Sequence, residues 1–299
     1  MTPGLHQLKR TIDAHFPQLK YFVSLTRLDR PIGIYLLLWP TLTALWIASE
    51  GWPGWHLFLV FVLGTVLTRS AGCIINDLAD MKFDGKVKRT LERPLVSGKV
   101  DPLAALFVAG GIAFVSLLLV LTTNSYTVYM SVFAVIIAVI YPFMKRFTHL
   151  PQAFLGIAFS WGIPMAFTAV NNEIANVAWL LLIANLLWVV AYDTQYAMVD
   201  RDDDISLGIK STAILFADLD RSMIAILQIS FLLTLLLIPR SVDLSVYYYF
   251  GLCGATGLFI YQHYLIWNRS RELCFEAFLN NHWVGLSIFL GIVVHYATI

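Results

Sequence analysis

The sequence predicts an all-α protein that crosses a membrane several times, and three observations indicate this class. The 299 residues are 59% hydrophobic and 13% charged, whereas soluble domains are about 45–50% apolar and about 25% charged. Apolar runs recur at the length of about 20 residues that a helix needs to cross a hydrocarbon layer about 30 Å thick. Lys and Arg concentrate in alternate connecting segments. The net charge of +1 excludes a strongly basic nucleic-acid-binding protein.

The candidate transmembrane helices are nine apolar runs. They cover residues 31–49, 56–76, 104–122, 126–144, 152–170, 177–196, 213–238, 246–267 and 282–298. Of the 20 Lys and Arg residues, nearly all lie before or at the start of the first run or around every second connecting segment, and the exceptions are Arg69 and Arg240. By the positive-inside rule, this distribution places the N-terminus in the cytoplasm and, after nine crossings, the C-terminus outside.

The segment before the first run predicts a helix on the membrane surface. Its apolar residues recur at intervals of three or four from Leu5 to Leu19, so we expect residues 1–30 to form a cytoplasmic amphipathic segment. We expect residues 1–299 to form a single membrane-embedded domain. Its two pseudo-repeated halves each carry one aspartate motif, at 76–84 and 193–204.

The first acidic motif follows the second apolar run. Asn76, Asp80 and Asp84 are four residues apart. A helix that continues out of the run would therefore place the three side chains along one face.

The second acidic motif follows the sixth run and repeats this pattern. Asp200 and Asp204 are again four residues apart, and Asp193 lies two turns earlier on about the same face. Four runs separate the two motifs, so both emerge on the cytoplasmic side. This placement is typical of a parallel internal repeat.

Paired carboxylates of this kind indicate a divalent cation and a phosphate ligand. Facing carboxylates repel one another, so two such pairs are tolerated mainly around a cation, and ligands of oxygen alone favour Mg²⁺, Mn²⁺ or Ca²⁺ over zinc. Basic residues follow the first motif at 82–93, and Lys145 and Arg146 end the fourth run. Carboxylates beside Lys and Arg suit a diphosphate. The basic residues taken alone are also explained as solvated loops that set the topology.

These segments resemble the motifs of the intramembrane aromatic prenyltransferases of the UbiA superfamily. The pattern NDxxDxxxD at 76–84, followed by VKRTxxRPLxSG at 87–98, is similar to the first motif of that family. YDTxYAxxDxxDD at 192–204, continuing to GIKST at 208–212, is similar to the second, and YPFMKRxTxxPQ at 141–152 is similar to the segment between them. The resemblance is greatest to the bacterial 4-hydroxybenzoate polyprenyltransferases of ubiquinone synthesis. The second half lacks an Asn-Asp opening, so the repeat is inexact.

The resemblance implies a fold, a reaction and a location. Nine helices would surround a central cavity that cytoplasmic loops cap and that opens sideways to lipid. The enzyme would transfer a polyprenyl chain from polyprenyl diphosphate to the carbon ortho to the phenol hydroxyl of 4-hydroxybenzoate. These two substrates and the lipid bilayer are the expected partners, with no nucleic acid and no protein partner. The expected location is the bacterial inner membrane, with the active site on the cytoplasmic side.

Within this scheme the acidic residues would hold two Mg²⁺ ions that bridge the diphosphate. Asp80 and Asp84 are assigned to one ion, with Asn76 as a neutral oxygen ligand. Asp200 and Asp204 are assigned to the other.

Basic residues would hold the diphosphate from its other side. Lys145 and Arg146 are the first candidates, and Arg89 and Lys210 are additions to them.

Three tyrosines and two charged residues complete the predicted site. Tyr141, Tyr192 and Tyr196 would stabilise the allylic cation through their rings, or would belong to an interfacial aromatic belt. Arg69, an intramembrane arginine two turns before the first motif, would bind the carboxylate of the aromatic acid or form a structural ion pair, for example with Asp193. Asp193 is the candidate to accept the phenol or ring proton.

Three other interpretations differ in what they require of the acidic residues. A prenyltransferase of the same superfamily with a naphthoate, haem or chlorin acceptor would share every motif. An ion-coupled transporter would place its carboxylates in broken helices near the bilayer midplane rather than at cytoplasmic helix ends. A noncatalytic lipid-binding scaffold would not need two matched aspartate pairs.

Overall fold

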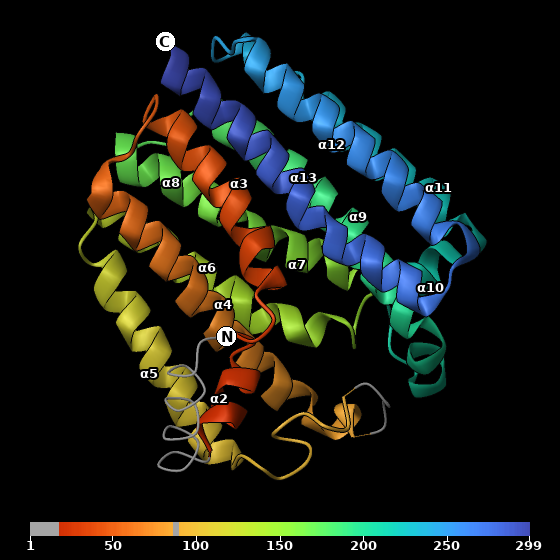
Figure 1. Cartoon of the computed structure of the whole chain (residues 1–299). Coiled ribbons are helices and arrows are strands. Elements are labelled where there is room, and N and C mark those ends of the chain that lie inside the picture. The colour runs from red at the N-terminus through yellow and green to blue at the C-terminus, as the bar shows by residue number, and fades with distance from the viewer. Residues whose placement is uncertain (1–17, 86–89) are drawn as a thin grey trace, which may run out of the picture. The chain divides into compact units, whose positions relative to one another are not determined.

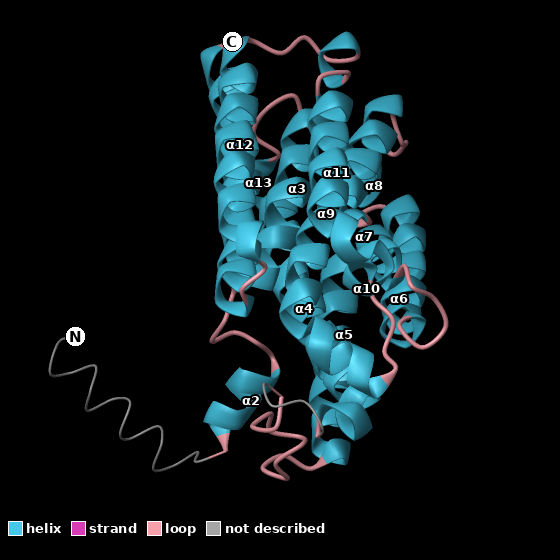
Figure 2. Ribbon diagram, turned by 90° about the vertical axis from the view of Figure 1, so that its right-hand side faces the viewer, coloured by secondary structure: helices cyan, strands magenta, loops and turns pink. Residues whose placement is uncertain are grey.

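Helices form all of the regular secondary structure in the described part of the chain (Figure 2). The structure is a computed structural model that describes residues 18–85 and 90–299, without the side chains of residues 82–84. No strand occurs within these ranges, so the prediction of an all-α protein is confirmed.

A helix, or two helices in succession, occupies each of the nine predicted runs (Figure 1). These helices are α3 (Ile32–Ala48), α4 (Gly54–Asp84), α5 (Pro102–Val120), α6 (Ser125–Met144), α7 (Pro151–Ser160), α8 (Gly162–Asn171), α9 (Asn176–Leu207), α10 (Thr212–Phe216), α11 (Asp220–Leu235), α12 (Val246–Leu265) and α13 (Arg271–Thr298). Before them, α2 (Leu19–Leu25) lies in the predicted amphipathic segment at residues 1–30. Residues 1–17 of that segment lie outside the described residues.

The described residues contain seven segments that are long and apolar enough to cross a membrane. The helix α3, with 17 residues, is a shorter apolar helix, and α12 is not among the seven. The chain is therefore a multi-pass membrane protein by length and composition, and the number of nine crossings stays a prediction.

The structure corrects the boundaries of three predicted runs. The last run was predicted to start at residue 282, but α13 begins at Arg271, because polar residues in its first three turns conceal the helix from a hydropathy pattern. The run at 152–170 is two helices, since Pro164 has no N–H to donate to the carbonyl oxygen four residues earlier. The run at 213–238 is also divided: α10 ends at Phe216, and α11 begins at Asp220, a residue type that favours helix starts.

Backbone contacts divide the chain into two units, which we describe separately. The first unit is residues 1–31 with 66–117, and the second is residues 32–65 with 118–299. In the first unit, buried side chains from α2, the second half of α4, the loop before α5 and α5 form one core. They are Leu25, Ile74, Leu95, Val100, Ala105 and Ala109.

In the second unit, α9 lies between several other helices (Figure 1). It packs against α7, α11 and α13, and α13 also packs against α3 and α12. Trp188 on α9 is only 1% exposed and belongs to a large apolar core. The second half of α9 continues into a second buried apolar cluster, to which it contributes Ala191, Ala197, Met198 and Val199.

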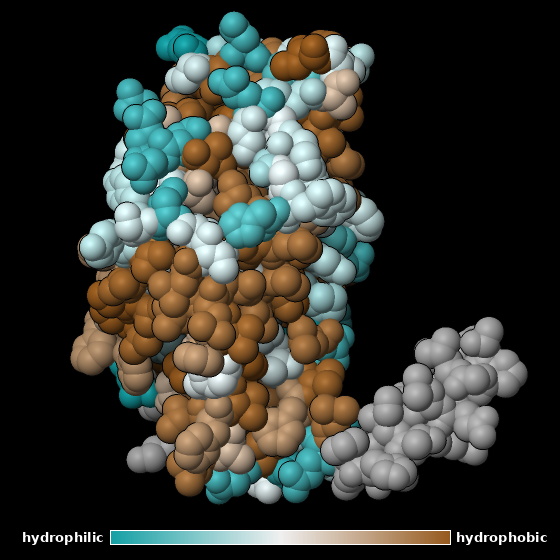
Figure 3. Space-filling model, turned by 90° about the vertical axis from the view of Figure 1, so that its left-hand side faces the viewer, coloured by the Kyte–Doolittle hydropathy of each residue, from teal (hydrophilic) through white to brown (hydrophobic). Residues whose placement is uncertain are grey.

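Large hydrophobic side chains cover much of one face of the molecule (Figure 3). On α5, Phe107 is 72% exposed and Phe114 is 60% exposed, and on α6 Tyr129 is 68% exposed. Soluble proteins rarely expose so much apolar surface to water, whereas contact with the hydrocarbon chains of a bilayer carries no such cost. These faces therefore fit contact with lipid.

The helices α12 and α13 approach each other closely because glycines line their contact. A Cβ atom at Gly251 would lie 2.8 Å from the carbonyl oxygen of Ser287, and one at Gly291 would lie 2.8 Å from that of Tyr247. The Ser287 hydroxyl also donates a hydrogen bond of 2.9 Å to the carbonyl oxygen of Gly251. Small residues at a helix crossing allow this backbone approach in membranes.

We expect Gly251→Ala to lower the free energy of unfolding by about 1–3 kcal/mol, because the added methyl group meets backbone atoms that cannot rotate away. Gly257→Ala on the same helix is the matched control, since a Cβ there has no atom within 4 Å. Thermal unfolding of both variants in the same detergent is the measurement. Equal midpoints for the two variants would contradict the close contact.

Candidate active site

The first acidic motif lies on one continuous helix, as predicted. The helix α4 runs for 31 residues and ends at Asp84, so it carries Asn76, Asp80 and Asp84 at successive turns. Asp80 is 3% exposed, and Asn76 is half-buried. The backbone of Asp84 is helical, but its side chain lies outside the described residues.

Asp77 belongs to the same motif, but ion pairs occupy its carboxylate. Its carboxylate accepts hydrogen bonds of 2.8 and 3.0 Å from Arg27 and of 3.0 Å from Arg93. The side chain of Asp77 is 3% exposed, and those of Arg27 and Arg93 are 23% and 17% exposed. The ion pairs join the segment after α2, the helix α4 and the loop after α4, so Asp77 holds the first unit together.

The second acidic motif also lies on one helix. The helix α9 runs for 32 residues and ends at Leu207. Asp193, Tyr196, Asp200 and Asp204 are half-buried, whereas most of the residues between Asp193 and Asp200 are buried. The predicted ligands therefore share one face of α9, and between Asp193 and Asp200 that face is less covered than the other sides of the helix.

The neighbouring acidic residues Asp202 and Asp203 of α9 both bind one arginine, the first residue of α13. Arg271 donates hydrogen bonds of 3.0 Å to Asp202 and 3.2 Å to Asp203. The Asp202 side chain is 80% exposed, so this pair lies at the surface and contributes little to stability. The pattern of acidic residues alone does not separate Asp202 and Asp203 from Asp200 and Asp204.

Three of the predicted diphosphate residues come from two segments that the structure brings together. The backbone N–H of Lys210 donates a hydrogen bond of 3.3 Å to the carbonyl oxygen of Lys145. The Lys210 ammonium donates one of 3.2 Å to the carbonyl oxygen of Phe147, and the Arg146 guanidinium lies 5.2 Å from the ring centre of Phe143. Arg89, the fourth predicted residue, lies outside the described residues.

Thr212, at the end of the GIKST segment, anchors this loop to the helices. Its hydroxyl lies 2.7 Å from that of Thr194 on α9, and its backbone N–H donates a hydrogen bond of 3.1 Å to Gln152 on α7. All three side chains are buried. These bonds fix the position from which Lys210 extends.

Two of the three predicted tyrosines belong to an aromatic cluster on α9 and α13. Tyr192 is 1% exposed, and its ring centre lies 5.4 Å from that of Trp188 and 6.1 Å from that of Phe278. Tyr196 lies 4.8 Å from Phe278. Tyr141 is half-buried near the end of α6. Whether these rings stabilise a cation stays a prediction.

Arg69 is half-buried on α4, seven residues before Asn76. It belongs to the first unit, whereas Asp193 belongs to the second. Its two predicted roles, as a ligand of the substrate carboxylate and as a structural ion-pair partner, both stay predictions.

The chemistry of the donors fits a hard divalent cation. Asp80, Asp200 and Asp204 offer carboxylate oxygens, Asn76 offers an amide oxygen, and Mg²⁺ usually takes only one or two carboxylates from a protein. Among the described side chains, no group of three or more His, Cys, Asp or Glu residues lies close enough to hold a metal ion. The assignment of these oxygens to metal ions therefore stays a prediction.

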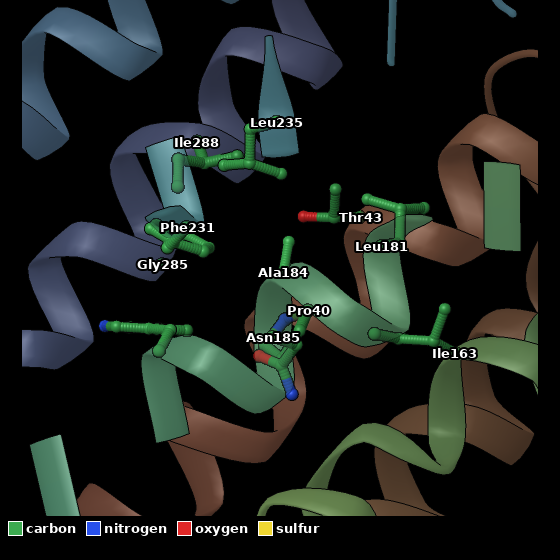
Figure 4. Close-up of a pocket in the computed structure, with 11 residues that line it drawn as sticks. Pro40, Thr43, Ile163, Leu181, Ala184, Asn185, Phe231, Leu235, Gly285 and Ile288 are labelled. Atoms are coloured by element: carbon green, nitrogen blue, oxygen red, sulfur yellow. The ribbon is translucent and has the colours of Figure 1, made fainter. Parts of the chain in front are cut away.

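A small cavity in the second unit is distinct from the acidic motifs (Figure 4). It has a volume of about 30 Å³. Most of its lining side chains are apolar, and the polar side chain of Asn185 also lines it. Asn185 donates a hydrogen bond of 2.9 Å to Ser160. A cavity of this size has room for a water molecule but not for a polyprenyl chain, so it is not the predicted substrate cavity.

The fold and these motifs define a class: helical membrane proteins with two acidic helix ends and a basic segment. The chain belongs to the UbiA prenyltransferase family, whose family model matches residues 37–286. It is 57% identical to a 4-hydroxybenzoate octaprenyltransferase of Photobacterium profundum over 92% of this chain and 96% of that protein. It is 55% identical to the 4-hydroxybenzoate octaprenyltransferase of Pseudomonas putida over 97% of this chain and 98% of that protein.

Solved structures share the fold. A UbiA homologue from Aeropyrum pernix matches with a TM-score of 0.77 and 24% identity, covering 88% of this chain and 97% of that one. A UbiA homologue from Archaeoglobus fulgidus, bound to GPP and Mg²⁺, matches with a TM-score of 0.66 and 15% identity, covering 92% of this chain and 99% of that one. These comparisons confirm the family that the sequence motifs predict.

We expect Asp77→Asn to destabilise the protein by about 3–5 kcal/mol, because the substitution leaves the Arg27 and Arg93 guanidiniums without a counter-charge. Asp29→Asn is the matched control, since Asp29 is 39% exposed and lies 3.9 Å from Arg30, which is 80% exposed. Denaturant unfolding followed by tryptophan fluorescence measures both. The interpretation of Asp77 is wrong if both variants unfold at the same denaturant concentration.

Proposed function

We propose that the chain transfers a polyprenyl group from polyprenyl diphosphate to carbon 3 of 4-hydroxybenzoate and releases diphosphate. The observation that carries the proposal is the pair of acidic motifs, each spaced by four residues on a single helix. The relatives named 4-hydroxybenzoate octaprenyltransferase, at 55–57% identity over more than nine-tenths of the chain, support this acceptor and a long prenyl donor.

The acidic motifs would bind the diphosphate through Mg²⁺. Asn76, Asp80 and Asp84 would supply oxygens to one ion, and Asp200 and Asp204 to the other. When bound, the ions would neutralise the diphosphate and stabilise the charge that develops on it as the leaving group. Solved structures of the Archaeoglobus fulgidus UbiA homologue bound to Mg²⁺ and to Cd²⁺ support a divalent cation.

The basic segment would hold the diphosphate oxygens directly. Lys145, Arg146 and Lys210 lie at adjacent backbone positions, and Arg89 would join them. Their positive charges favour the diphosphate leaving group, which gains one negative charge as the C–O bond breaks, over the less negatively charged bound ester, so they would lower the energy of bond breaking.

The remaining residues would guide the carbon chemistry. The C–O bond between prenyl carbon 1 and the diphosphate breaks, and the diphosphate takes the electron pair. The ring carbon ortho to the hydroxyl forms the new C–C bond to carbon 1 and then loses its proton, for which Asp193 is the proposed acceptor. Tyr141, Tyr192 and Tyr196 would stabilise the allylic cation with their ring faces and exclude water.

We propose the location that the family resemblance implies and the topology that the charge pattern predicts. The chain would cross the bacterial inner membrane nine times as one domain, with its N-terminus and acidic motifs in the cytoplasm and its C-terminus outside. The confinement of basic residues to alternate connecting segments supports this orientation.

We expect Asp80→Asn and Asp200→Asn each to lower the rate of product formation by about 100-fold or more, because each removes a metal-binding carboxylate. The assay follows labelled 4-hydroxybenzoate in membranes with an octaprenyl donor and Mg²⁺, and EDTA should abolish product. Asp202→Asn is the matched control on α9 and should keep a rate within about twofold of wild type, because its side chain is 80% exposed and pairs at the surface. The proposal is wrong if product forms without a divalent cation, or if both variants form product at the wild-type rate.

We expect Arg69→Ala to raise the KM for 4-hydroxybenzoate by about 10- to 100-fold, the effect of one lost charged hydrogen bond, with little change in the KM for the prenyl donor. Phenol, which lacks the carboxylate, provides the control: its turnover should be equally poor with both enzymes. A lower yield of folded protein with an unchanged KM would instead favour the structural ion pair.

A further inference from the structure

The predicted ligands Asp200 and Asp204 lie in the last two turns of α9, which ends at Leu207. The backbone N–H groups of Gly208 and Ile209 cap this end at 3.3 Å from the carbonyl oxygen of Ile205 and 3.0 Å from that of Asp204, but a cap holds the backbone and not the side chains. A metal site needs its carboxylates held in a fixed orientation, so contacts outside α9 must restrain this end.

Asp220, the first residue of α11, is the buried centre of one such set of contacts. Its side chain is fully buried, and it accepts hydrogen bonds of 2.8, 2.9 and 3.1 Å from the Arg269 guanidinium. Arg269 also donates one of 2.8 Å to the carbonyl oxygen of Asp218. The carboxylate of Asp220 further accepts a bond of 2.6 Å from the backbone N–H of Arg221. The acid is thereby fixed to the start of α11 and to the loop before α13.

Arg201 connects α9 to this fixed acid. It lies between Asp200 and Asp204 in the sequence, and its guanidinium is 3.4 Å from the Asp220 carboxylate. Its side chain is 24% exposed, so the contact is largely shielded from water. Arg201 leaves the helix about 100° around the axis from Asp200, so it reaches Asp220 without occupying the ligand face.

We propose that Arg201, held by Asp220 and Arg269, is a positioning residue that sets the orientation of Asp200 and Asp204 for metal binding. This inference rests on the proposed function, in which these two aspartates bind a divalent cation. Residues that orient metal ligands change metal affinity by about 10- to 100-fold when they are lost.

Because Arg201 is positively charged, an electrostatic role and a positioning role predict opposite changes in cation affinity when it is replaced. Removing a positive charge beside a cation site should strengthen cation binding if electrostatics alone acted. Loss of orientation should weaken it. Arg201→Gln therefore separates the two effects, and Asp220 keeps the bidentate pair with Arg269 in this variant.

The experiment titrates purified full-length protein in nanodiscs with Mn²⁺ and measures bound metal by electron paramagnetic resonance. We expect Arg201→Gln to weaken Mn²⁺ binding by about 10-fold or more. Arg201→Lys should restore part of the affinity, since a lysine still pairs with Asp220 but lacks the planar fork. Asp202→Asn, which removes a charge from the exposed pair with Arg271, should change the affinity by less than about twofold.

Two further measurements make the outcome decisive. Thermal unfolding identifies the folded fraction of each variant, so affinity is compared among folded molecules. Equal or tighter Mn²⁺ binding by folded Arg201→Gln would overturn the positioning role. Asp200→Asn tests the underlying function: if its Mn²⁺ binding equals that of wild type, the metal assignment itself fails, whatever Arg201→Gln does.

Discussion

The free energy of placing a charge in a medium of low polarity constrains the whole molecule. An ionised carboxylate away from water is tolerated only when guanidiniums or other donors surround it. Both units solve this problem in the same way, with one buried aspartate between two arginines: Asp77 with Arg27 and Arg93, and Asp220 with Arg201 and Arg269. Each group also joins a helix that carries an acidic motif to segments far away in the sequence.

Uncharged polar groups obey the same constraint inside the second unit. The Gln262 side chain accepts hydrogen bonds of 3.1 Å from Gln195 and 2.9 Å from Gln228, and Asn281 donates one of 2.8 Å to Gln195. Trp188 donates one of 2.9 Å to Asn281. These residues come from α9, α11, α12 and α13, and each is nearly or fully buried. These bonds determine which faces of the four apolar helices meet. Hydrophobic contacts are not directional, so they would specify this arrangement less well.

The sequence predicts the local parts of this structure well. The four-residue spacing from Asn76 to Asp84 and from Asp200 to Asp204 predicts helices that continue beyond the apolar runs, and α4 and α9 do so. Such spacing is a property of one helix, so it can be read without knowing the fold. A hydropathy pattern misses the start of α13 at Arg271, because its first turns are polar, whereas Ser270, which caps the helix, and Glu272 in the first turn are the signal that could have found it.

The roles of individual charges were harder to predict than the helices. Asp77 lies 50 residues from Arg27, and Asp220 lies 49 residues from Arg269, so no periodicity links either pair. Asp77 follows Asn76 directly in an acidic motif, and its neighbours alone do not distinguish a structural carboxylate from a metal ligand. The proximity of Lys210 to Lys145 likewise depends on the anchoring of Thr212 to α7 and α9, which only the folded chain shows.

The unbroken length of α9 gives the distance along the helix axis between its first residue and its acidic motif. At 1.5 Å per residue its 32 residues span about 48 Å, against about 30 Å for the hydrocarbon layer. Asp200 lies 24 residues beyond the first residue of the helix, or about 36 Å along its axis. A helix of this length is long enough to cross a hydrocarbon layer about 30 Å thick and to place Asp200 beyond its far surface. An amphiphilic ligand bound at such a boundary keeps its charged head in water and its apolar tail in hydrocarbon. Neither part then has to be transferred into the other medium.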